Sequence, residues 1–247
     1  MIKARKRTRP IAAAVAMAFV LSLAGALVGA ELQAIKLNPP DLKRGLLFMQ
    51  ALSVKASARE FSEKELSLQD LSDLLWAADG INRPAENKST ASSAMNAHDV
   101  RIYVFMKNGA YLYDAPKHEL APVLAGDYRS QIMMARPPRP AAPAAPPAGA
   151  AAAPPSPPPA AMAPANPPVQ IILVSDSERF RRGTPELKLE WGALDAGIVS
   201  QNISLFCAAT GLKTVPRASM DKDKIRYLLK LADTQTIFLN HPVGYAK

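Results

Sequence analysis

Two short polar segments carry the side chains with the clearest chemical potential. The first is Lys55-Ala56-Ser57-Ala58-Arg59, in which two cations and a hydroxyl occupy alternate positions. Because alternate residues of an extended backbone point to the same side, Lys55, Ser57 and Arg59 could hold one anionic group between them. Taken alone, two cations on a loop are far more often ordinary solvated surface. The second segment is Ser92-Ser93-Ala94-Met95-Asn96, a polar loop stretch.

Other common catalytic chemistries find little support in the sequence. The three histidines, His98, His118 and His241, are scattered, and the single cysteine, Cys207, excludes a disulfide within the chain. No metal-ligand spacing, glycine-rich phosphate loop or nucleophile elbow is present. Nucleophilic and metal-assisted hydrolysis are therefore poorly supported, and we expect Cys207 to be a small buried apolar side chain.

The first 30 residues have the features of a secretory signal. Five basic residues among the first nine precede an apolar run up to Val28 and the small pair Gly29-Ala30. We expect cleavage before Glu31 and export to the periplasm or beyond. The alternative is an uncleaved membrane anchor, because the apolar run approaches the length of a span. Without the leader the formal net charge falls from +9 to +4, which indicates an ordinary surface rather than a nucleic-acid footprint.

The segment Pro137 to Pro168 differs in composition from the rest of the chain. Its 32 residues include 14 prolines and 13 alanines, so it offers few backbone donors and little to bury. We expect a semi-extended, solvated tether. It separates residues 31–136 from residues 169–247, and the expected strands are divided between these two blocks. One domain interrupted by a long surface insertion is the simplest account.

The second block is expected to be organised around one long helix. Thr184 suits the N-cap, a proline follows in the first turn, and Gly211 marks the C-terminal stop. No charged residue lies between Asp195 and Lys213, and apolar side chains cover most of the circumference. Such a helix lies in a core or a membrane, and four interrupting polar residues favour the core. We therefore expect Phe206 to be buried.

The remaining periodicities predict the order ααββα before the tether and βαβαβ after it, which fits an α+β sheet wrapped by helices. The predicted helices and strands are helices at 41–52, 68–79 (capped by Ser67), 128–134 and 221–231, and strands at 100–106, 111–113, 169–174, 214–215 and 236–239. Residues 82–99 are predicted as a long polar loop, and loops of that length are usually functional or disordered.

Several of these stretches together resemble one known family. They are KASAREF (55–61), LSLQDLSDLLWAADGINRP (66–84), SSAMN (92–96), LDAGIVSQNISLFCAATGLKTVP (194–216) and IFLNHPVGY (237–245). The sequence resembles the nitroreductase-like flavoproteins, and is most similar to the branch that includes the thiazoline/oxazoline dehydrogenases of peptide maturation. The resemblance covers residues 48–247 apart from the tether.

The resemblance implies a mainly antiparallel sheet wrapped by helices around a central apolar helix, and a homodimer with FMN at the subunit interface. It assigns six residues to flavin binding: Lys55 and Ser57 at the phosphate with Lys247 as a further contact there, Arg59 at the pyrimidine edge, and Ser93 and Asn96 on the ring. A guanidinium beside the pyrimidine edge favours reduction, because reduced flavin carries negative charge near N1 and O2.

The sequence also departs from the family pattern. Lys55 stands where an arginine is more usual, Ser92 where proline is common, and Met95 where glycine is frequent. His98-Asp99 replace a Gln-Pro or Tyr-Pro pair, and the tether occupies a segment in which relatives place helices near the flavin and substrate. These departures bear on substrate specificity more than on fold.

The resemblance therefore implies an exported, FMN-dependent oxidoreductase in which hydride passes through flavin N5 in a ping-pong cycle. Its electron donor and acceptor are small molecules that the sequence does not name, and no residue is assigned a catalytic role. One alternative is a non-catalytic binding module that kept the fold. Another, a scaffold on a Pro/Ala stalk, is weaker because the tether lies inside the domain.

Overall fold

The computed structural model describes residues 31–133 and 167–247. The expected leader and the tether as far as residue 166 lie outside these residues. From Leu32 onward the described residues belong to one compact unit. Within the described ranges, no helix is both long and apolar enough to cross a membrane.

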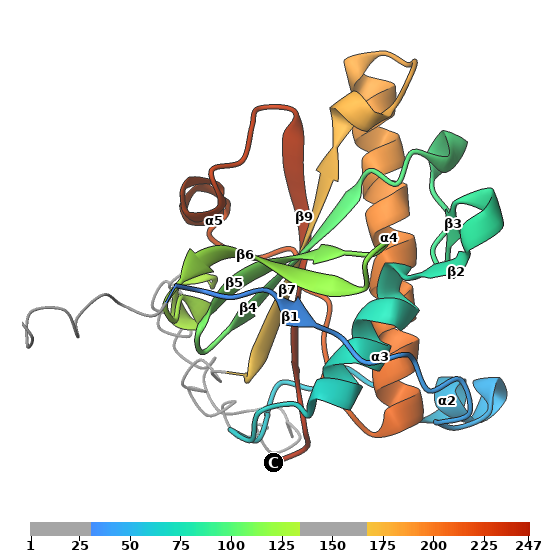
Figure 1. Cartoon of the computed structure of the whole chain (residues 1–247), viewed down its shortest axis with the longest axis vertical. Helices are drawn as coiled ribbons and strands as arrows, with labels where there is room; N and C mark the ends of the chain where they lie inside the picture. Colours follow the sequence, from blue (N-terminus) through green and yellow to red (C-terminus); the bar gives the residue numbers. More distant parts are fainter. Residues whose placement is uncertain (1–30, 134–166) are drawn as a thin grey trace, which may run out of the picture. The chain divides into compact units, whose positions relative to one another are not determined.

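An antiparallel sheet of seven strands forms the centre of this unit (Figure 1). Its order is β1-β6-β5-β4-β7-β9-β8, and every neighbouring pair is antiparallel. The strands are β1 Ile35–Lys36, β4 Val100–Met106, β5 Gly109–Asp114, β6 Glu119–Ala125, β7 Val169–Asp176, β8 Lys213–Thr214 and β9 Gln235–Gly244. Because β4 pairs with β7, the two blocks on either side of the Pro/Ala-rich segment contribute neighbouring central strands.

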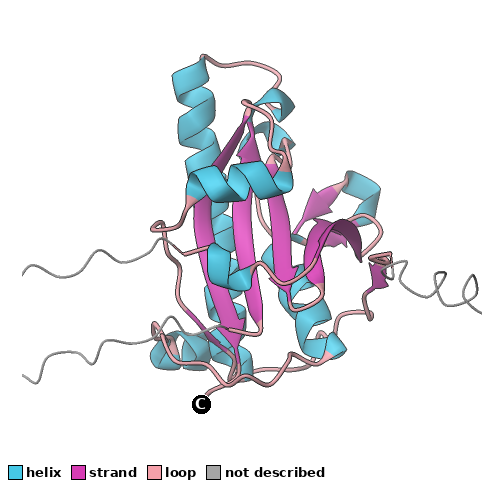
Figure 2. Ribbon diagram, turned by 90° about the vertical axis from the view of Figure 1, so that its left-hand side faces the viewer, coloured by secondary structure: helices cyan, strands magenta, loops and turns pink. Residues whose placement is uncertain are grey.

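Helices cover both faces of this sheet. They are α2 Phe48–Val54, α3 Leu68–Asp79, α4 Pro185–Thr210 and α5 Lys222–Leu229. Strand β4 shows the two-sided burial, since Ile102 and Val104 pack with α3 and α4 while Tyr103 and Phe105 pack with α5. Figure 2 shows α5 lying across the face opposite α4. The α+β architecture with a mainly antiparallel sheet agrees with the prediction.

The long helix α4 begins and ends where the sequence predicts. The Thr184 side chain accepts a hydrogen bond from the backbone N–H of Leu187, and Gly211 takes the left-handed conformation with φ of 80°. The expectation that Phe206 is buried was wrong: it is only partly buried, beneath the guanidinium of Arg44 at 5.7 Å. A helix lying against one side of a sheet buries only the stripe facing the sheet and α3, so its outer apolar side chains remain exposed.

Other predictions in the first block also differ from the structure. The helix expected from residue 41 begins only at Phe48, because Asp73 accepts the backbone N–H of Asp41 and pairs with Arg44, which holds that stretch in turns. The expected loop at 82–99 contains a hairpin of β2 (Ile81–Arg83) and β3 (Lys88–Ser89). Strands this short carry no readable periodicity.

Strand β6 was not predicted, because Pro122 interrupts its pattern. The proline pairs opposite Tyr111, next to a register shift at which β6 carries one extra residue, Val123, as a bulge. The helix expected at 128–134 is instead a 3₁₀ turn over Arg129–Gln131. The last strand is longer than predicted and continues through Pro242.

Removing the N-cap of α3 by Ser67→Ala is expected to lower the free energy of unfolding by about 1 kcal/mol. The Ser67 hydroxyl accepts the backbone N–H of Asp70 at 3.0 Å, and alanine leaves that donor unpaired. Urea denaturation at fixed protein concentration measures the loss. Ser53→Ala, an exposed position at the end of α2, is the control and should stay within about 0.5 kcal/mol of the parent. Equal effects of the two substitutions would contradict the capping role.

Candidate functional site

The segment that carries Lys55, Ser57 and Arg59 leaves the end of α2 and runs beside β8. The backbone N–H of Ala58 donates to the carbonyl of Thr214 at 3.0 Å. The two alanines of the segment line a cavity of about 450 Å³ against the C-terminal end of α4. The three polar side chains that alternate with these alanines are exposed, and none has a hydrogen bond or ion pair with another described residue. They are available for an external ligand.

Positive charge gathers where this segment meets the C-terminus of the chain. Arg59, Lys213 and Lys247 line one cavity of about 410 Å³, with Glu60 as its acidic member. Arg217 lies near enough to Arg59 to feel its charge. Burial first, and that charge second, lower the pKa of Arg217. None of these four cations has an ion-pair partner among the described residues. An anion such as a phosphate suits this cluster.

The second predicted segment forms a short 3₁₀ turn over Ala94–Asn96. The side chain of Asn96 donates to the carbonyl of Asn87 at 3.2 Å, and Ser93 Oγ accepts the backbone N–H of His98 at 2.9 Å. Both predicted side chains therefore support the loop itself. The Ser93 hydroxyl hydrogen and the Asn96 Oδ1 atom remain as a donor and an acceptor for a ligand.

The backbone of this turn adopts an unfavourable conformation. Met95, Asn96 and His98 have φ values of 56°, 54° and 48°, a region that favours glycine. Each such residue costs roughly 1–2 kcal/mol, less for asparagine, so contacts from outside must hold the turn. One of these contacts is a hydrogen bond of 2.8 Å from the backbone N–H of Ala94 to Asp195 Oδ2 on α4.

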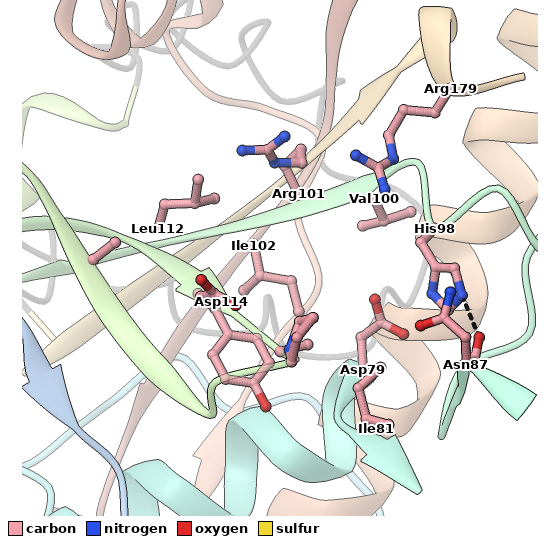
Figure 3. Close-up of a pocket in the computed structure, with 14 residues that line it drawn as sticks. Asp79, Ile81, Asn87, His98, Val100, Arg101, Ile102, Leu112, Asp114 and Arg179 are labelled. Atoms are coloured by element: carbon pink, nitrogen blue, oxygen red, sulfur yellow. Dashed lines mark hydrogen bonds between the residues drawn. The ribbon is translucent and has the colours of Figure 1, made fainter. Parts of the chain in front are cut away.

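A cavity of about 400 Å³ lies behind the turn, between β4 and β5 (Figure 3). It opens because these strands pair only from Tyr103↔Leu112 to Met106↔Gly109 and then diverge. Figure 3 shows Asp79 beside His98, whose ring is bonded to the Asn87 carbonyl, with Arg179 above them.

Asp79 is a charged cavity residue that sequence reasoning missed. Burial raises its pKa to about 6, which makes it a candidate for proton exchange near neutral pH. An aspartate at the end of a helix has no distinguishing sequence signal. Lys213 and Arg217, also missed, follow the core helix, and only the folded chain brings them to Arg59.

The two predicted segments lie at different levels along α4. The chain entering α2 is bonded to α4 at Ala209, through the backbone N–H of Leu46, whereas the Ser93–Asn96 turn is bonded at Asp195. Fourteen residues of helix correspond to about 20 Å. Figure 1 shows α2 near one end of α4 and the β2–β3 hairpin farther along it. Within one chain, the segment expected at the flavin phosphate and the turn expected at the flavin ring are therefore far apart.

The histidines and the cysteine have separate surroundings. His118 bonds to Tyr113 at 2.8 Å, and the buried His241 bonds to Ser200 at 2.8 Å. Across the described ranges, no three histidine, cysteine, aspartate or glutamate residues come together as a metal site. Cys207 is 1% exposed, and burial raises the pKa of its thiol, which confirms its prediction as a small buried side chain.

Comparisons with known proteins agree with this architecture. The profile of the Nitroreductase family matches residues 53–245. A candidate nitroreductase of Methanocaldococcus jannaschii is 23% identical over 216 residues, which cover 85% of this chain and 96% of that protein. The crystal structure of a candidate nitroreductase from Ralstonia eutropha is 27% identical, with a TM-score of 0.71 over 89% of this chain and 92% of that chain.

A third similarity is to a chain of the Escherichia coli microcin synthetase complex with a truncated pro-microcin bound. It is 14% identical, with a TM-score of 0.58 over 98% of this chain and 85% of that chain. This likeness concerns the fold. Taken with the match over residues 53–245, the sheet and its central helix lead to one conclusion: the chain belongs to the nitroreductase family.

Proposed function

We propose that this nitroreductase-family oxidoreductase uses FMN and that the cation cluster of Arg59, Lys213, Arg217 and Lys247 binds it. Arg59 would lie at the pyrimidine edge of the ring, and the other three cations near the phosphate. The main support is the convergence of these cations without ion-pair partners among the described residues. A cluster of four cations with one neighbouring carboxylate, Glu60, keeps an excess of positive charge that an anion would offset, and family membership favours a flavin phosphate.

The residues present fit the cofactor. Lys55 and Ser57 have unengaged side chains next to the cluster, and Arg59 lines it, so a phosphate and an adjacent anionic ring edge can both find donors. Ser93 and Asn96 each keep one hydrogen-bonding atom for the ring. Bound FMN would supply hydride transfer at N5 in a ping-pong cycle, and the protein would supply binding, orientation and electrostatics.

We further propose that the working unit is a homodimer. Leu187, Leu194 and Ile198 share one face of α4 and are 42%, 60% and 37% exposed, and Phe48 and Met49 of α2 are also exposed. Apolar exposure on this scale marks an interaction surface. A two-fold axis that pairs two α4 helices antiparallel would bring the Lys55–Arg59 segment of one protomer toward the Ser93–Asn96 turn of its partner.

Two further elements of the proposal are export and the branch of the family. The leader-like first 30 residues support export, and the microcin-synthetase likeness is compatible with the branch of thiazoline/oxazoline dehydrogenases. Electron donor and acceptor would then be small molecules outside the cytoplasm. A non-catalytic module is the second candidate, favoured by the bonds that Ser93 and Asn96 make within their own loop.

Lys55→Ala and Arg59→Ala are expected to weaken FMN binding about tenfold or more, because each removes a charge-assisted hydrogen bond of roughly 1.5–3 kcal/mol. Only Arg59→Ala should also lower the midpoint potential, because reduction makes the ring edge beside Arg59 anionic while the phosphate charge is unchanged. Titration of apo-protein with FMN gives the affinity, and a redox titration of each holoprotein gives the potential.

Arg182→Ala, an exposed cation in the loop before α4, is the matched control and should behave as the parent. Parental FMN affinity in both Lys55→Ala and Arg59→Ala would remove this segment from the site. A colourless parent protein that cannot be reconstituted with FMN would favour the non-catalytic module.

A further inference from the structure

Two buried carboxyl groups face each other directly behind the Ser93–Asn96 turn. Asp99 precedes β4 and is 0% exposed, and Asp195 on α4 is 4% exposed. Asp195 is close enough to disfavour ionisation of Asp99, and it binds the turn at Ala94, five residues before Asp99. Neither carboxyl has a lysine, arginine or histidine within ion-pair distance among the described residues. Two ionised carboxylates in such surroundings repel each other and lose their hydration.

The hydrogen bonds around the pair leave one oxygen of Asp99 without a partner. Ser175 donates to Asp99 Oδ2 at 2.5 Å, and the backbone N–H of Ala94 donates to Asp195 Oδ2 at 2.8 Å. The other oxygen of Asp99, Oδ1, is buried and has no partner. Gly192 permits this packing, because a Cβ there would lie 2.3 Å from the Ser175 hydroxyl oxygen. A proton on Asp99 Oδ1 would turn this unpartnered oxygen into a hydrogen-bond donor.

We propose that Asp99 and Asp195 share one proton, held on Asp99 Oδ1 and donated to Asp195, and that this proton keeps the Ser93–Asn96 turn in the shape that meets the flavin. The second half rests on the proposed function. Asp195 then accepts two hydrogen bonds, one from Asp99 and one from the strained turn. Both aspartates are positioning residues that act through the Ala94 N–H.

The electrostatics of the surroundings agree with a retained proton. Burial, together with the neighbouring Asp195, raises the pKa of Asp99 to about 7. The charged groups around the pair are Asp79 on α3, His98 in the preceding turn, Arg179 after β7 and Asp176 at the end of β7. Arg179 donates its Nε to the carbonyl of Ala97, so it remains outside the pair.

The direction of the pH dependence follows from this raised pKa. Between the ordinary aspartate pKa of about 4 and the folded value, the native state binds a proton that the unfolded chain has released, so stability falls as pH rises through that window. Above it both carboxylates are charged, and their repulsion displaces Asp195 from the N–H of Ala94. We expect FMN affinity to fall about tenfold between pH 6 and pH 9.

Asp99→Asn and Asp195→Asn test the proposal, because either amide supplies an N–H donor to the remaining carboxylate without a titrating proton. Both variants should keep their FMN affinity constant from pH 6 to pH 9. Urea denaturation of the apo-proteins should show the parent losing stability between pH 5 and pH 8, with a smaller loss in both variants. Asp79→Asn is the control for the neighbouring acid and should retain the parental loss above pH 6.

Amide hydrogen exchange at Ala94 provides a readout that needs no flavin. At each pH the parent is compared with both asparagine variants. Above pH 7 the Ala94 amide should lose protection in the parent and keep it in both variants. Equal stability profiles in the parent and Asp99→Asn would overturn the shared proton. Unchanged Ala94 protection in the parent would overturn its role in positioning the turn. If the parent bound no FMN at any pH, the proposed function would fail, whereas the exchange and stability data would still decide this inference.

Discussion

Truncation of Ile203 to alanine is expected to lower the free energy of unfolding by about 2–5 kcal/mol. Ile203 lies on the buried stripe of α4, is 0% exposed, and packs in the core that α3, α4 and the sheet share. Alanine removes buried methyl groups and leaves a cavity that rigid neighbours fill only in part. Urea denaturation at one fixed protomer concentration measures the change, because association would otherwise shift the midpoint.

Two variants on the same helix make the comparison specific. Gln201→Ala, at an exposed position, should stay within about 0.5 kcal/mol of the parent. Phe206→Ala should fall between this control and Ile203→Ala, because that side chain is only partly buried. A larger loss at Phe206 than at Ile203 would mean that the buried stripe of α4 has been misplaced.

The parts of the fold that were predicted carry local signals. Thr184 and Gly211 bound α4, Ser67 begins α3, and the apolar run of β7 reflects burial on both faces. Strand β6 was not predicted, because Pro122 conflicts with strand propensity and is accommodated only beside a bulge of β6 that the paired strands reveal. The β2–β3 hairpin was not predicted, because its strands are too short to show an alternation of apolar and polar residues.

The residues of the candidate site also fall into two groups, those that local sequence identifies and those that only the folded chain reveals. The alternation of Lys55, Ser57 and Arg59 is a property of local sequence, so these residues could be singled out. By contrast, the sequence does not distinguish Lys213 or Asp195 from other charged residues. Only folding places Lys213 in a cation cluster and buries Asp195. The raised pKa values of Asp79 and Asp99 come from burial, which is a tertiary property. Sequence reasoning finds groups with suitable chemistry and misses those that packing alone makes unusual.

Mixing two defective variants is expected to restore FMN binding that each lacks alone. In the proposed dimer each flavin takes its phosphate and pyrimidine-edge contacts from one protomer and its contacts to Ser93 and Asn96 from the other. The double variant Lys55→Ala/Arg59→Ala damages the first set, and Ser93→Ala/Asn96→Ala damages the second. A dimer with one protomer of each kind has one site with both defects and one intact site.

Random exchange of protomers makes half of the dimers mixed, so about one site in four should bind FMN with parental affinity. The measurement is FMN stoichiometry after the two apo-variants are unfolded and refolded together, with each variant refolded alone as the control. If one protomer supplied the whole site, co-refolding would restore nothing, because every site would keep one set of defects. The roughly 20 Å that separates the two segments along α4 favours restoration, since the antiparallel pairing of two such helices brings complementary halves together.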